Sequence, residues 1–137
     1  MKVVLSPPLK ILRDALRFAG DGDLESAIGI LRLGIDLCER EPEHHSSLPR
    51  LTSNLVLLYR RRGQIDEALM AVRRSLLLLP NDRGLLHLLA DLLLEKGHIA
   101  EAAQAAMELR RVCEANLATF TADWAEALLL LENRIIG

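Results

Sequence analysis

Apolar residues recur along most of the chain at intervals of three and four, the period of an α-helix with one covered face. The periodic segments come in pairs, and a short break that contains glycine separates the two members of each pair. Each pair predicts a helical hairpin, and the chain is therefore predicted to be all-α. The expected helices lie at about 9–19, 24–40, 51–62, 66–79, 85–96, 99–114 and 121–136.

A short motif repeats within these hairpins. The sequence GQIDEAL begins at Gly63, GHIAEAA begins at Gly97, and a third version, GDLESAI, begins at Gly22. Each glycine falls where a helix stops and the chain turns, and it has no side chain to oppose a left-handed backbone there. Each copy also has an alanine five residues later, where a small side chain lets the two helices approach closely. The repeat is interpreted as a packing unit.

The interval of 34 residues between Gly63 and Gly97 and the motif around it resemble the tetratricopeptide repeat, a helix-turn-helix unit of that length. The middle copy carries most of the matching residues, namely Leu55, Tyr59, Ala68, Val72 and Pro80. The resemblance implies a right-handed α-solenoid of three hairpins and a C-terminal capping helix, in a single domain over residues 1–137. The implied repeats lie at about 8–41, 49–82 and 83–116, and the capping helix at 121–136. Glu39 and Glu114 replace the closing proline in the outer copies, a departure typical of end repeats.

One interval is longer than the others. Gly22 and Gly63 are 41 residues apart, so seven extra residues lie in or near EPEHHSSLP. Either the second helix runs two turns further, or the segment between Pro42 and Pro49 bulges outward as a loop. The two prolines and two serines favour the loop.

Composition narrows the range of functions. Of the 137 residues 50% are hydrophobic and only 3% aromatic, and the formal charge of -2 gives no basic surface for nucleic acid. Cys38 and Cys113 lie in helical segments and are expected to be reduced and buried. The start of the chain has no apolar run of signal-peptide length, and no segment reaches the length of a membrane span. These features predict a soluble, cytoplasmic protein.

Side chains with possible chemistry are few. Cys38, Glu43, His44 and His45 could contribute to a metal site, but their spacing does not match known zinc sites and a solvated loop is preferred. No nucleophile with an orienting base and no glycine-rich phosphate loop is apparent, so no cofactor and no enzymatic activity are expected. The arginine pairs at 73–74 and 110–111 are interpreted as solvated faces, with a basic patch for an acidic partner as the alternative.

The resemblance also implies a binding surface. In tetratricopeptide repeats the first helix of each hairpin lines a concave groove that binds an extended peptide or a helix of a partner protein. The implied groove is apolar in the first repeat, basic in the second and acidic in the third, which suits a ligand with a hydrophobic anchor beside acidic residues. Some of its leucines could instead pack under the chain's own segment 2–8. The groove residues are Leu12, Leu16, Arg50, Ser53, Asn54, Leu57, Arg60, Arg61, His87, Asp91 and Glu95.

The expected function is that of a non-enzymatic adaptor with an unidentified protein partner, with no role for nucleic acid or membrane. The residues that grip a C-terminal carboxylate in the co-chaperone branch of the family are mostly missing, since only Asn54 matches. The overall form is closer to small bacterial adaptors.

The last expected helix is more apolar than one packing face requires. Four of its apolar residues, Trp124, Leu128, Leu131 and Ile135, line one side. They are predicted to form an oligomer surface, most simply in a homodimer, or to receive another protein. The alternative function is thus a structural protein that assembles through this helix.

Overall fold

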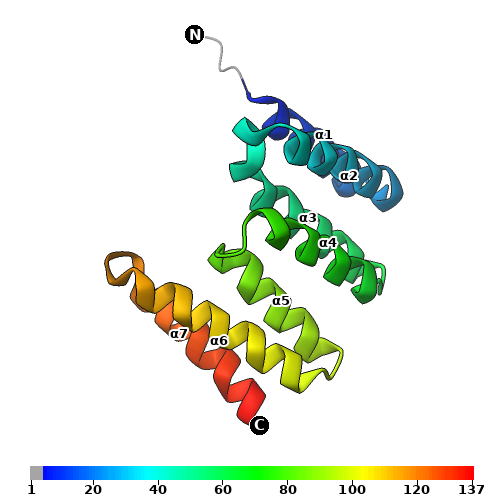
Figure 1. Cartoon of the computed structure of the whole chain (residues 1–137). Coiled ribbons are helices and arrows are strands. Elements are labelled where there is room, and N and C mark those ends of the chain that lie inside the picture. The colour runs from blue at the N-terminus through cyan, green and yellow to red at the C-terminus, as the bar shows by residue number, and fades with distance from the viewer. Residues whose placement is uncertain (1–4) are drawn as a thin grey trace. The chain divides into compact units, whose positions relative to one another are not determined.

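The computed structural model describes residues 5–137, which form seven α-helices and two short 3-10 helices (Figure 1). No strand occurs in this part of the chain, and none of its helices is long and apolar enough to cross a membrane. The prediction of an all-α fold is confirmed. The elements are α1 (Pro7–Gly20), α2 (Leu24–Arg40), η1 (Pro42–Ser47), α3 (Leu48–Arg61), α4 (Ile65–Leu78), α5 (Arg83–Glu95), α6 (Ile99–Ala115), η2 (Leu117–Thr119) and α7 (Ala122–Ile136).

The chain divides into two compact units, residues 1–71 and 72–137, with the boundary inside α4. In the first unit α1 and α2 form an antiparallel hairpin, and α3 packs against α2 and also touches α1 (Figure 1). Its core includes Leu31, Leu48 and Leu51. Residues 2–4, part of the segment that was the alternative cover for some groove leucines, lie outside the described residues.

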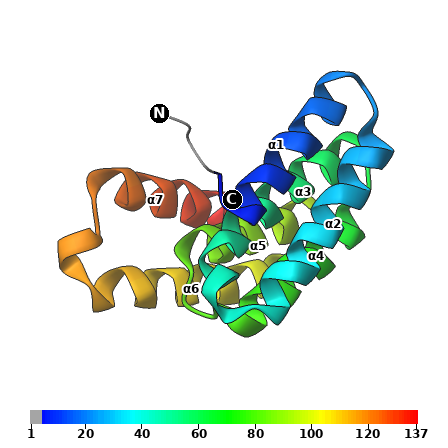
Figure 2. The same ribbon diagram turned by 90° about the horizontal axis from the view of Figure 1, so that it is seen from above.

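The second unit repeats this arrangement of a hairpin followed by a third helix. Helices α5 and α6 form the hairpin, and α7 packs mainly against α6 and also contacts α5. Figures 1 and 2 both show α7 beside α6 along most of its length. Leu85, Leu92, Leu109, Leu128 and Leu131 are almost fully buried in this unit. Each unit thus has a core of leucine side chains.

The turns of the hairpins confirm the interpretation of the repeated motif. Gly63 and Gly97 have φ angles of 71° and 77°, in the left-handed region that favours glycine. The alanine five residues after each glycine, Ala68 and Ala102, is fully buried. The predicted cap of the last helix is also present, because the Thr121 hydroxyl accepts a hydrogen bond from the Trp124 amide at 3.4 Å.

The seven extra residues do not form an outward loop as predicted. Six residues here, Pro42–Ser47, form η1, which contacts both α2 and α3, and α2 ends at Arg40 as expected. Two features tie η1 down: Leu48, directly after it, is fully buried, and a ring nitrogen of His45 lies 3.1 Å from the Glu39 carbonyl oxygen. The buried leucine at its end therefore holds this polar segment against α2 and α3, although no residue of η1 is itself buried.

Candidate functional site

An open row of side chains runs along α3 in the first unit. Arg50, Ser53, Leu57 and Arg61 are spaced by three, four and four residues, which places them on one side of the helix, and all four are exposed. The opposite side is the buried one, with Leu55 and its neighbours in the core. We call these four residues the α3 row.

Two polar groups on this helix are bonded to the backbone one turn earlier. The Ser53 hydroxyl donates to the Pro49 carbonyl oxygen, and the Asn54 side-chain amide donates to the Arg50 carbonyl oxygen at 2.8 Å. Asn54 and Arg60, both predicted groove residues, are only partly exposed. The chemistry that the α3 row presents to solvent is therefore that of two guanidinium groups and a leucine.

Helix α1 contributes less to this surface than predicted. Leu16 is 49% exposed, the same value as Leu57, but Leu12 is buried. The expectation that Leu12 lines a groove is wrong, because α1 touches both α2 and α3 and Leu12 lies with Ala15 on its covered side.

In the second unit the chain's own last helix engages the predicted groove residues of α5. The ring of Trp124 meets that of His87 edge to face at 6.5 Å, and the Arg83 guanidinium lies 5.9 Å from the centre of the same indole. Asp91 pairs with Arg134 of α7 at 2.6 Å. Of the predicted groove residues on α5, two thus contact α7, and Glu95 is exposed.

The residues predicted to form an oligomer surface face the inside of this unit. Leu128 and Leu131 are each only 1% exposed, and Trp124 and Ile135 are partly covered. The prediction is wrong for the two leucines, because α7 places this side against α6 and α5. The apolar residues that α7 exposes are others, Leu129, Leu130 and Ile136.

Three of the four arginines in the pairs on the second helices form ion pairs with nearby acids. Arg73 pairs with Glu101 at 3.0 Å, and Arg111 pairs with Glu108 at 3.1 Å. Arg110 pairs with both Glu114 and Glu132, and these two hydrogen-bonded carboxylates raise the pKa of its guanidinium. The arrangement agrees with solvated faces rather than with a basic patch for an acidic partner.

The side chains with metal-binding potential are arranged around η1. Cys38 is fully buried, and burial together with nearby Glu41 and Glu39 raises the pKa of its thiol. Ligand atoms of Glu41, Glu43 and His44 lie within 4.8 Å of one another. His44 pairs with Glu41 at 3.3 Å, a contact that also holds η1 in place.

Comparison with known proteins identifies the fold. The TPR domain of Sgt2 from Aspergillus fumigatus aligns with 95% of this chain and 80% of its own length, at a TM-score of 0.67 and 14% identity. The C-terminal TPR-containing domain of an FK506-binding protein from Plasmodium falciparum aligns with 93% of this chain and 87% of its own length. The TM-score of this alignment is 0.64 and the sequence identity is 16%.

A tetratricopeptide repeat protein from Parabacteroides merdae aligns with 74% of this chain at a TM-score of 0.61 and 24% identity, and this chain spans 38% of that protein's length. No family model and no curated protein matches the sequence. The chain therefore has the helical-repeat fold of tetratricopeptide-repeat proteins, as the spacing of its motif predicted.

Proposed function

We propose that this helical-repeat chain is a non-enzymatic protein-binding module that binds a peptide segment of a partner along α3. The observation that carries the proposal is the α3 row, in which Arg50 and Arg61 lie on either side of Leu57 on one exposed side of the helix. The repeat fold supports a binding role, since stacked hairpins present their first helices as extended binding surfaces. Buried, unpaired thiols at Cys38 and Cys113 suit a cytoplasmic site of action.

The chemistry of the row defines the ligand. Leu57 is a half-exposed apolar side chain, and Leu16 on the neighbouring α1 is equally exposed. Arginine binds carboxylates through two parallel hydrogen bonds, a geometry that lysine cannot reproduce. The proposed ligand is therefore a segment with one apolar anchor and acidic residues on both sides of it.

The length of the row sets the size of that segment. Arg50 and Arg61 are eleven residues apart, which corresponds to about 16 Å along a helix axis. An extended peptide covers about 3.3 Å per residue, so about five residues bridge the two guanidinium groups. The two acidic side chains are accordingly expected about five positions apart, with the apolar anchor between them.

Selection of peptides from a random library tests the proposal, because it does not require the natural partner to be identified. A displayed library of random peptides is selected on the wild-type chain, and the affinity of enriched peptides is measured by fluorescence anisotropy. The variants are Leu57→Glu and the double variant Arg50→Glu/Arg61→Glu. The control is Arg62→Glu, which reverses one arginine charge one residue off the row.

The enriched peptides are expected to carry the acid–apolar–acid pattern. Both row variants should weaken binding by at least about tenfold, the equivalent of one interaction of about 1.4 kcal/mol, while the control binds as the wild type does. Binding should also weaken as salt is raised, because the contacts are between exposed charges. Peptides that lack acidic residues, or that bind the row variants as tightly as the wild type, would refute the proposed site.

A further inference from the structure

The outer side of α7 carries large, exposed apolar side chains. Leu129 and Ile136 lie seven residues apart, two helical turns, and are 57% and 84% exposed. Met107 of the adjacent α6 is 64% exposed. Apolar side chains that gather on one surface to this extent mark an interaction site more often than an ordinary surface.

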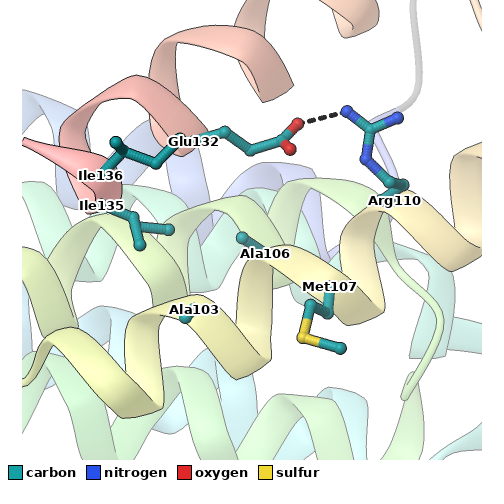
Figure 3. Close-up of a pocket in the computed structure, with 7 residues that line it drawn as sticks. All are labelled: Ala103, Ala106, Met107, Arg110, Glu132, Ile135 and Ile136. Atoms are coloured by element: carbon teal, nitrogen blue, oxygen red, sulfur yellow. Dashed lines mark hydrogen bonds and ion pairs between the residues drawn. The ribbon is translucent and has the colours of Figure 1, made fainter.

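A pocket of about 210 Å³ lies between α6 and α7 on this side (Figure 3). Its volume is below the range of about 300–1,000 Å³ typical of small-molecule sites, so it is better suited to one large side chain of a protein. The walls are apolar except at one end. The lining residues are Ala103, Ala106, Met107, Arg110, Glu132, Ile135 and Ile136.

An ion pair closes the polar end of the pocket. The Glu132 carboxylate reaches across from α7 to the guanidinium of Arg110 on α6 (Figure 3). The two side chains are still 33% and 44% exposed. Since Glu132 comes between Leu129 and Ile136 in α7, the ion pair separates an exposed leucine on one side from the apolar pocket on the other.

This arrangement is self-complementary. In a two-fold symmetric interface each surface has to contain both members of every complementary pair. Here a protruding leucine and a pocket sized for one side chain lie on opposite sides of a charge pair. A two-fold axis through the ion pair would bring each leucine to the other copy's pocket, and each arginine near the other copy's glutamate.

We infer that a second copy of the chain docks on this side of α7, with Leu129 of each copy inserted between Met107 and Ile136 of the other. The two α7 helices run antiparallel across the axis, and Asn133, the residue after Glu132, lies close to its own equivalent. The dimer thus uses the outer side of α7, opposite to Leu128 and Leu131. It does not depend on the proposed peptide site on α3.

Sedimentation equilibrium over a wide range of concentrations tests this dimer. The variant is Leu129→Glu, and the matched control is Leu130→Glu, which introduces the same charge at a neighbouring position that is 56% exposed but lies on a different side of the helix. Circular dichroism confirms that both variants keep their helices. The wild type and the control are expected to dimerise with the same Kd.

The Leu129→Glu variant should raise that Kd by at least about a hundredfold, since a carboxylate would have to enter an apolar pocket. A second measurement locates the axis. Under oxidising conditions Asn133→Cys should form a disulfide-linked dimer, whereas Glu126→Cys should not. A wild type that stays monomeric at every concentration, equal Kd values for Leu129→Glu and Leu130→Glu, or cross-linking at 126 but not at 133 would each overturn the inference.

Discussion

Among the glycines of the chain, Gly34 in the middle of α2 leaves the least room for an added methyl group. A Cβ placed on Gly34 would lie 2.6 Å from the Cγ2 atom of Ile11 on α1, closer than such atoms approach in proteins. Gly29 lies on the same helix, and a Cβ placed there meets nothing within 4 Å. The substitutions Gly34→Ala and Gly29→Ala therefore make the same chemical change, but only the one at Gly34 produces a steric clash.

The two effects at Gly34 can be weighed separately. Replacing glycine by alanine inside a helix stabilises by about 1 kcal/mol through backbone propensity. The clash acts in the opposite direction, and overpacking of a filled contact costs about 1–3 kcal/mol. Ile11 cannot relieve it by a small rotation, because Cγ2 is attached to the branched Cβ and isoleucine in a helix has one strongly preferred χ1 rotamer.

We therefore expect Gly29→Ala to raise the free energy of unfolding by up to about 1 kcal/mol. The free energy of unfolding of Gly34→Ala should be about 1–3 kcal/mol lower than that of Gly29→Ala, a difference that equals the cost of the clash alone. Urea unfolding followed by circular dichroism gives both values. In the background of Ile11→Ala, which lacks Cγ2, Gly34→Ala should become stabilising. If Gly34→Ala stabilises as much as Gly29→Ala in the wild-type background, the close approach of α1 and α2 is refuted.

Two further predictions concern packing and pH. Ala68→Leu should lower the free energy of unfolding by about 1–3 kcal/mol through overpacking at a fully buried position; Met70→Leu on the exposed side of α4 is the control, and an unchanged melting temperature for Ala68→Leu would contradict the repeat register. Hydrogen bonds from the Ser26 side chain and amide lower the pKa of Asp23 below its ordinary value of 3.8. A lowered pKa stabilises the folded state above pH 3.8, and this contribution is lost as the pH falls through the pKa of the folded protein. The difference in unfolding free energy between wild type and Asp23→Asn should therefore shrink from neutral pH to strongly acidic pH, and a difference independent of pH would rule out this role for the carboxylate.

The sequence predicts best those parts of the fold in which a single residue satisfies a local need of the backbone, such as a turn or a helix cap. Gly63 and Gly97 mark the turns because only glycine adopts a positive φ there without strain. The span predicted for the second helix, 24–40, agrees with α2 because an aspartate cap precedes Leu24 and its apolar period stops at Arg40. Such signals are local in the chain, and they do not depend on which elements meet in space.

The candidate sites depend on tertiary contacts, and the sequence predicts them less well. Leu12 and Leu16 have the same character and lie four residues apart, and only the contact of α1 with α2 and α3 makes one buried and the other exposed. Helix α7 carries leucines on several sides, so its period does not tell which side packs on α6. The sequence favours the side with Trp124 as the open one, whereas the structure covers that side and leaves Leu129 open. A charged residue at Leu128 would consequently test folding rather than association.

Cys38 and Cys113 are fully buried, and each is the only cysteine of its compact unit. Each thiol can react with a reagent in solution only when the helices around it open, so its rate of modification measures the opening of its own unit. Equal rates for the two thiols across a denaturant series would mean that the whole chain opens in one step. Two different rates would mean that one unit opens while the other stays folded. The faster rate would identify the unit that is more readily exposed to a protease or a chaperone.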